Sequence, residues 1–446
     1  MEKNDNIVRW LQILGGVILT DFYLFSPTLS LFPYGNTKML MAAIAIVLLL
    51  ITPYRNTVRT FVVMCIYALF VSLCGYITVV INNTHDYTYV TYVISMAVWL
   101  GGAYTLARYL RVVHNDLHLR TVAFYLVAVC ALQCISALIM SHYAVFVDFV
   151  DRLVVGQKAM MEYGGSERLY GISCGFDVAG IRFSSVLIIA FFFLKSTISD
   201  EHNSFLFKML YCLSLAIIAI IGNSISRTTS VGLVLGLFYV ISQLSLSSNN
   251  VVRKQMWKWL VGISVITILI VTYLYYTDPQ FKHYLRFGFE GFFSLAETGE
   301  WNVHSNEVLR NMYIFPNNFK TWLFGDGLFI DTTQEPWYVG PVYKGYYMGT
   351  DIGYLRFIFY FGVVGLLSFI TFLLYSMKIC IRLFPCYKAM FYGLMLLQFI
   401  IFAKVATDIF MVFAIYITCG FVCKQFGIKD GLDNNKMYVR KTYTMD

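Results

Sequence analysis

Long apolar segments alternate with short polar ones along almost the whole chain. A helix that crosses the roughly 30 Å apolar layer of a membrane needs about 20 such residues, so windows of about 19 residues are the natural unit for this sequence. These windows predict twelve spanning helices, at residues 9–25, 38–52, 59–81, 89–107, 119–142, 177–195, 205–221, 227–245, 257–276, 351–376, 387–403 and 409–424. The last two form one apolar run, which the polar segment KVATD (404–408) divides into two helices.

Two of the predicted connections are far longer than the others. The first, 143–176, carries apolar residues at helical spacing near its start, which predicts an amphipathic helix along the membrane surface. The second, 277–350, joins the ninth and tenth predicted helices and contains 18 aromatic residues. Such aromatic side chains form either an interfacial belt or platforms on which sugar rings stack. Long connections of this kind are more often functional than idle.

The chain therefore divides into six predicted segments. They are membrane helices 1–5 (1–142), a loop with an amphipathic helix (143–176), helices 6–9 (177–276), a large external loop (277–350), helices 10–12 (351–424) and a tail (425–446).

Composition agrees with an all-α polytopic membrane protein. The mean hydropathy is +0.67, and 59% of the residues are hydrophobic against 13% charged, which argues against a soluble globular chain. Spans of this length are too long for the strands of a barrel. The sequence contains no zinc spacing, Walker loop or dinucleotide fingerprint, so ATP-driven transport by this chain alone is not expected.

The net charge of +8 is explained by the membrane and does not require a nucleic-acid partner. With the N-terminus inside, 20 of the 33 basic residues fall in predicted cytoplasmic segments. Only Lys38, Arg227 and Lys404 fall in short external loops. This distribution predicts a multi-pass protein with both termini in the cytoplasm and its two long loops outside.

Five basic residues lie in or beside the predicted external helix ends: Arg168, Arg182, Arg227, Arg356 and Lys404. Arginine forks and helix N-terminal amides suit phosphate and pyrophosphate groups, so these residues predict an anion site at the external membrane boundary. Taken singly, each cation has an ordinary alternative, which is to extend to the interface or to pair with a nearby acid.

The segment 301–365 has a second group of ionisable residues just before and inside an apolar span, where charge is costly and tends to be kept for function. They are His304, Glu307, Arg310, Asp326, Asp351 and Arg356.

Three motifs resemble the superfamily of bacterial O-antigen polymerases (Wzy-type) and O-antigen ligases. The first is SISRTTSVGLVLG (224–236), and the second is RLYGISCGFDVAG (168–180). The third is LFGDG (323–327) followed by TDIGYLRFIFYFGVVG (350–365), which is most like polymerases of capsule and O-antigen clusters. The resemblance covers roughly 165–425, and the first four spans are generic.

The resemblance implies a glycosyltransferase of the all-helical, GT-C-like type in the bacterial inner membrane, with a periplasmic active site. Its substrates would be undecaprenyl-pyrophosphate-linked oligosaccharides, and its partners membrane lipid and a chain-length regulator. No metal or cofactor is required, because the donor already carries a good leaving group. Arg227, Arg168 and Arg356, with Arg182 and Lys404, would bind the pyrophosphate. Asp351, His304 or Glu307 would take the acceptor proton, with inversion at the anomeric carbon.

Three other functions remain open on the sequence. A ligase would share the donor and use lipid A core as acceptor, but family ligases place a loop histidine before asparagine, whereas His304 precedes Ser305. A flippase for lipid-linked glycans would leave the long external loop unexplained. A sensor or scaffold would explain the helices and not the arginines.

Overall fold

The computed structural model describes residues 2–52, 55–246, 250–331 and 345–426. Within these ranges the chain is built from α-helices and two 3₁₀ turns, with isolated β-bridges and no strand. The helices are α1 (Glu2–Leu24), α2 (Thr37–Ile51), α3 (Arg55–Asn82), α4 (Tyr92–His114), α5 (Leu119–His142), α6 (Ala144–Leu153), α7 (Gln157–Gly164), α8 (Phe176–Ser199), α9 (Phe205–Ile225), α10 (Thr229–Leu246), α11 (Asn250–Thr277), α12 (Pro279–Gly288), α13 (Glu290–Thr298), α14 (His304–Asn311), α15 (Phe319–Phe324), η1 (Tyr347–Gly349), α16 (Gly353–Leu383), η2 (Pro385–Tyr387), α17 (Lys388–Phe402) and α18 (Phe410–Gln425).

The all-α membrane architecture predicted from the apolar segments is confirmed. Among the described residues, eight helical segments are long and apolar enough to cross a membrane, in α1, α3, α5, α8, α9, α11, α16 and α17. The apolar helices α2, α10 and α18 are shorter. Each of the twelve predicted spans overlaps a helix, and 404–408 does separate α17 from α18. The count of twelve spans, the orientation and the identity of the membrane stay predictions. The predicted tail lies outside the described residues from 427 onward.

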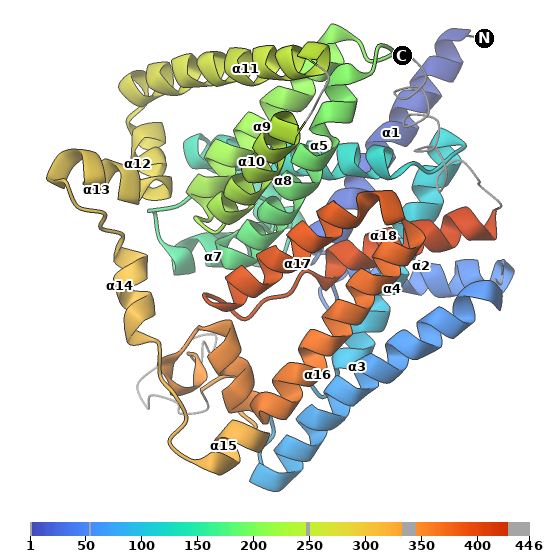
Figure 1. The fold of residues 1–446 in the computed structure, drawn as a ribbon, viewed down its shortest axis with the longest axis vertical. Coiled ribbons are helices and arrows are strands. Elements are labelled where there is room, and N and C mark those ends of the chain that lie inside the picture. The colour runs from blue at the N-terminus through green and yellow to red at the C-terminus, as the bar shows by residue number, and fades with distance from the viewer. Residues whose placement is uncertain (1, 53–54, 247–249, 332–344, 427–446) are drawn as a thin grey trace.

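The centre of the bundle is formed by α8 and α18, whose side chains are buried almost throughout. Small residues allow close packing there. A Cβ on Gly232 of α10 would lie 2.2 Å from the Cα of Ser184 on α8, so this helix pair requires glycine. In contrast, α11 exposes apolar side chains such as Ile268 and Leu269 along its length, and it lies at the edge of the bundle (Figure 1).

The long loop 277–350 contains helices that the apolar pattern did not predict. In Figure 1, α12, α13 and α14 follow α11 down one side of the bundle towards α15. Local sequence explains their starts: the carboxylate of Asp278 accepts hydrogen bonds from the backbone N–H groups of Gln280 and Phe281, and Pro279 occupies the first turn. In α15, the side chain of Asn318 caps the N–H of Thr321 in the same way.

Helix α16 is interrupted at Phe361 and Gly362, where Gly362 has φ +69°. The LFGDG segment fills the gap, since the N–H of Asp326 donates to the carbonyl of Phe359 at 2.6 Å and the N–H of Gly327 donates to Tyr360 at 3.0 Å. A Cβ on Gly362 would lie 2.1 Å from the carbonyl oxygen of Leu323. The motif therefore serves as a structural support for a broken helix.

The other side of LFGDG is held by α3. Thr78 Oγ1 donates to the carbonyl of Phe324 at 2.7 Å, and Asn82 Nδ2 donates to that of Gly325 at 3.1 Å. Both Gly325 and Gly327 have positive φ, of 73° and 70°, as expected for tight turns. The loop thus connects the C-terminal end of α3 to the N-terminal half of α16, which positions the residues just before α16.

Candidate functional site

A cavity of about 250 Å³ lies where the long loop approaches the ends of several membrane helices. Five of the eight site residues predicted from the sequence line it together. These are Arg168, Arg227, His304, Asp351 and Lys404. They come from the loop before α8, the α9–α10 connection, the start of α14, the segment before α16 and the α17–α18 connection. The remaining lining is formed by Glu167, Asp177, Ser226, Phe287, Ser305, Val308, Leu309 and Met312.

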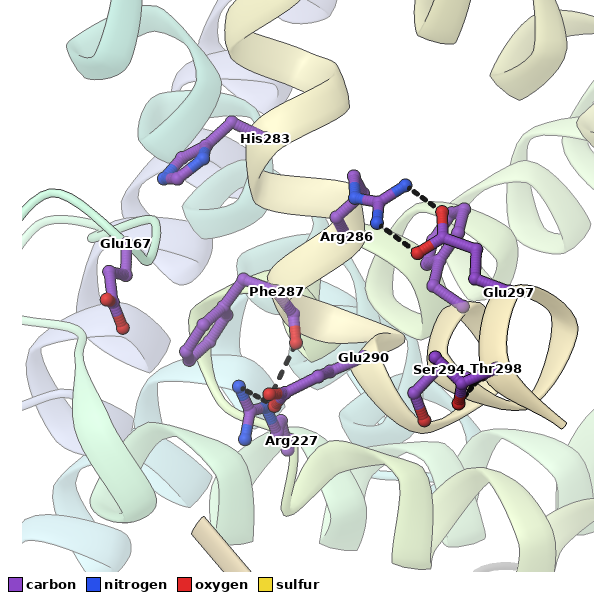
Figure 2. A pocket seen from close by; sticks show the side chains of 10 residues that line it. Glu167, Arg227, His283, Arg286, Phe287, Glu290, Ser294, Glu297 and Thr298 are labelled. Atoms are coloured by element: carbon purple, nitrogen blue, oxygen red, sulfur yellow. Dashed lines mark hydrogen bonds and ion pairs between the residues drawn. The ribbon is translucent and has the colours of Figure 1, made fainter. Parts of the chain in front are cut away.

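Arg227 lies in the short connection between α9 and α10, and its guanidinium is held by the long loop. Nη2 forms an ion pair with Glu290 at 2.6 Å, Nη1 donates to Ser305 Oγ at 2.9 Å and Nε donates to the carbonyl of Phe287 at 2.9 Å. The same guanidinium also lies 4.2 Å from the centre of the Phe287 ring. Figure 2 shows this contact between Arg227, Phe287 and Glu290. The loop is therefore attached to the bundle through Arg227.

Arg168 approaches the Phe287 ring as well. Its guanidinium carbon is 5.2 Å from the centre of that ring and 5.3 Å from the ring of Phe176. Within the described ranges Arg168 has no carboxylate at ion-pair distance, and its Nε is buried without a hydrogen bond. Phe287 thus lies against two guanidinium groups, and one of them is available to an anion.

Lys404 is held by Asp177, a residue that the sequence analysis did not select. The ammonium forms an ion pair with Asp177 Oδ1 at 2.7 Å and donates to Thr228 Oγ1 at 2.8 Å. Thr228 in turn donates to the same carboxylate oxygen. A sequence signal existed, since Asp177 is an acid in the first turn of an apolar helix, where it also favours the helix N-terminus.

Asp351 lines the cavity just before α16, and Arg356 lies behind it. Arg356 Nη1 is 3.2 Å from Asp351 Oδ1, and Nη2 donates to the carbonyl of Phe329 at 3.1 Å. The guanidinium is stacked between the rings of Phe329, at 3.7 Å, and Tyr346, at 4.6 Å. Only 8% of Arg356 is exposed, and it does not line the cavity. It is placed to orient Asp351.

The environment of Asp351 raises the pKa of its carboxyl to about 6. Burial is the main cause, because it penalises the charged form. The cation of Arg356 opposes this effect and lowers the pKa, as does a hydrogen bond with Tyr346. A carboxyl with a pKa near 6 changes protonation in the range in which a general base works.

The structure places only one of the residues His304, Glu307 and Arg182 at the cavity. His304 begins α14 and lines the cavity, and its backbone N–H donates to Glu290 Oε1 at 3.3 Å. Glu307 lies on α14 but is exposed and does not line the cavity. Arg182 is buried within α8, with its guanidinium 5.4 Å from the ring of Phe25, and is also absent from the lining. Their predicted roles stay predictions.

The cavity is balanced in charge, although the sequence suggested a cationic pocket. Arg227 is paired with Glu290 and Lys404 with Asp177. Pairing with a nearby acid was the ordinary alternative for each cation. An incoming anion therefore has Arg168 available directly and must share or replace the carboxylate on Arg227.

In the part of the chain that the structure describes, no group of three or more His, Cys, Asp or Glu residues is arranged to hold a metal ion. Comparison of the chain with family models, with curated proteins and with solved structures found no match.

Proposed function

We propose that this chain is a membrane glycosyltransferase that moves a glycan from a polyprenyl-pyrophosphate carrier to a hydroxyl of a second lipid-linked glycan, and so polymerises repeat units. The observation that carries the proposal is one cavity that combines a carboxyl of raised pKa, Asp351, with the basic groups of Arg168, Arg227 and Lys404. The motif resemblance supplies the substrate class.

In the proposed reaction the acceptor hydroxyl oxygen attacks the anomeric carbon and its proton passes to the Asp351 carboxylate. The bond from that carbon to the pyrophosphate oxygen breaks, and its electron pair leaves with the pyrophosphate. Asp351 suits the role of base because it lines the cavity and its pKa of about 6 leaves it mostly ionised at neutral pH. Glu307 is exposed and outside the lining, which makes it the weaker candidate.

The leaving pyrophosphate gains negative charge, and guanidinium groups stabilise that charge through paired N–H donors. Arg168 and Arg227 meet this need together, because both lie over the ring of Phe287. The ring of Phe287 contacts both guanidinium groups through cation–π interactions. Lys404, which is held by Asp177, adds a third cation to the lining.

The proposal is tested by analysing surface glycan on a gel, from a strain that lacks the gene and carries either the wild-type or a variant copy. Arg227→Ala and Asp351→Asn should reduce the ladder to core plus a single repeat, with the variant protein still in the membrane. Arg253→Ala removes an exposed arginine at the start of α11 and should leave the ladder unchanged. A normal ladder from Arg227→Ala would contradict the anion role.

The same gel separates the alternatives. Polymer that accumulates on the lipid carrier, with no glycan on lipid A core, would indicate a ligase. Single repeats trapped on the cytoplasmic side, detected by their resistance to periplasmic glycosidase, would indicate a flippase.

A further inference from the structure

A second cavity, of about 340 Å³, adjoins the first one. The two share Glu167, Arg227 and Phe287 in their linings, so the Arg227–Phe287 contact forms the wall between them. The rest of the second cavity belongs to α12 and α13 of the long loop, and Figure 2 shows its side chains. They are His283, Arg286, Glu290, Phe293, Ser294, Glu297 and Thr298.

One wall of this cavity, formed by Arg286, Phe293 and Glu297, is held together by contacts among these side chains. Arg286 donates two hydrogen bonds to Glu297, at 2.7 and 2.8 Å, and its guanidinium carbon is 4.9 Å from the ring centre of Phe293. The other face of the wall is fixed by Tyr275 of α11, whose ring stacks on Phe293 at 5.9 Å. This wall connects α11, α12 and α13, so the cavity is built into the loop.

The two cavities differ in their balance of charge. The first contains three basic residues and three carboxylates, whereas the second contains three carboxylates, Glu167, Glu290 and Glu297, against two guanidiniums. A pyrophosphate would meet more negative charge in the second cavity. Carboxylates are strong acceptors for the hydroxyl groups of sugars, and phenyl rings cover the apolar faces of sugar rings. The second lining therefore suits a glycan without negative charge.

We propose that the second cavity is the subsite for the sugar residues of the acceptor glycan, and that Glu290 couples it to the anion site. This inference rests on the proposed function. Glu290 is placed for both roles, because it lines the second cavity while its Oε2 lies 2.6 Å from Arg227 Nη2, in the wall shared with the first.

The coupling follows from competition for one carboxylate. Without an anion, Arg227 holds Glu290, so that carboxylate is less available to a sugar hydroxyl. When phosphate oxygens bind Arg227, they replace Glu290, which is then released to accept hydrogen bonds in the second cavity. Pyrophosphate therefore strengthens glycan binding, and by linkage the glycan strengthens pyrophosphate binding by the same factor.

The test uses the full-length protein purified in detergent, with binding measured by calorimetry. One probe is inorganic pyrophosphate. The other is the free repeat-unit glycan, released by mild acid from lipid-linked glycans of the strain that lacks the gene. We expect wild-type protein to bind each probe, and to bind the glycan about fivefold or more tightly when pyrophosphate is saturating.

Three variants and a control make the test specific. Glu290→Gln should bind both probes with the coupling lost, whereas Glu297→Gln, in the same cavity but paired with Arg286, should keep the coupling. His283→Trp fills the cavity from an exposed position on α12 and should abolish glycan binding while leaving pyrophosphate binding intact. His85→Trp, exposed between α3 and α4, should change neither.

If the melting curve shows that His283→Trp does not fold, Thr298→Trp obstructs the same cavity from α13 and takes its place. Unchanged glycan affinity in a folded obstructed variant would overturn the subsite, and full coupling in Glu290→Gln would overturn the role of Glu290. If wild-type protein binds pyrophosphate and no glycan, only this inference falls. If it binds no pyrophosphate, the proposed function falls, and the coupling falls with it.

Discussion

Arg356 and Asp351 are five residues apart in the sequence and 3.2 Å apart in space, with the arginine buried behind the aspartate and only the aspartate lining the cavity. The rings of Phe329 and Tyr346 lie against the guanidinium, which is almost fully buried. The pair therefore divides two tasks: Asp351 lines the cavity, and Arg356 orients its carboxyl and lowers its pKa.

The first prediction concerns pH. Below a pKa of about 6 Asp351 is protonated and cannot accept a proton, so the rate of polymerisation in isolated membranes should rise as pH increases through about 6. Asp351→Asn should lower the rate by about 10²–10⁴-fold and remove this rise.

Substitutions of Arg356 test whether this residue controls the pKa of Asp351. Its cation lowers the pKa of Asp351, so Arg356→Ala should move the rising part of the pH profile to higher pH, and Arg356→Lys should restore part of the shift. A profile that stays in place in Arg356→Ala, with normal protein levels in the membrane, would show that a group other than Asp351 titrates.

The second prediction concerns the ion pair between Lys404 and Asp177, which connects the α17–α18 connection to α8 at 2.7 Å. Lys404→Met and Asp177→Asn should each lower the melting temperature in detergent, and the double variant should lose less than the sum. Because both side chains are partly exposed, at 36% and 27%, we expect a coupling of only about 1 kcal/mol. Additive losses would mean that the pair contributes nothing as a pair.

The third prediction concerns the break in α16. Gly362 has φ +69°, and a Cβ there would lie 2.1 Å from the carbonyl oxygen of Leu323. Gly362→Ala should therefore destabilise the protein by about 1–3 kcal/mol or more, measured by thermal unfolding. Gly262 on α11 is the control, since a Cβ there meets nothing within 4 Å and alanine favours a helix. Equal melting temperatures for the two variants would contradict the strain at Gly362.

The fourth prediction concerns orientation. Cys386 lies in the turn η2 between α16 and α17 and is exposed, whereas the other cysteines are buried or half-buried. The distribution of basic residues predicts that this turn is cytoplasmic and that α13 is outside. A membrane-impermeant maleimide applied to intact spheroplasts should label Thr298→Cys and not the native Cys386, and permeabilisation should expose both. Labelling of Cys386 in intact spheroplasts would reverse the predicted topology.

The membrane helices could be predicted from the sequence because apolar length alone specifies them. The helices of the long loop could not, since α15 has only six residues and is held by its contacts with α16 and α3. The interruption at Gly362 was also hidden, because an apolar window gives no sign of backbone conformation. The two glycines of LFGDG form tight turns that support α16 and do not line the cavity.

The candidate site shows the same division. Residue type and position near helix ends were enough to select five side chains that share one cavity. Their partners were not selected, because the pairs Arg227–Glu290 and Lys404–Asp177 join segments far apart in the chain. Arg356 and Arg182 were selected from the sequence but do not line the cavity. A basic residue near a helix end does not reveal which way its side chain points.

The contacts of LFGDG with α3 have a consequence for biosynthesis. Thr78 and Asn82 bind carbonyl groups that lie 246 and 243 residues later in the chain. At about 5–20 residues per second, the ribosome needs on the order of tens of seconds to supply those partners. During that interval Thr78 and Asn82 have only their hydrogen bonds within α3, to the carbonyl groups of Cys74 and Thr78. The N-terminal helices therefore reach their final packing only after most of the protein has been made, and a chain that stops after α11 lacks the segment that completes them.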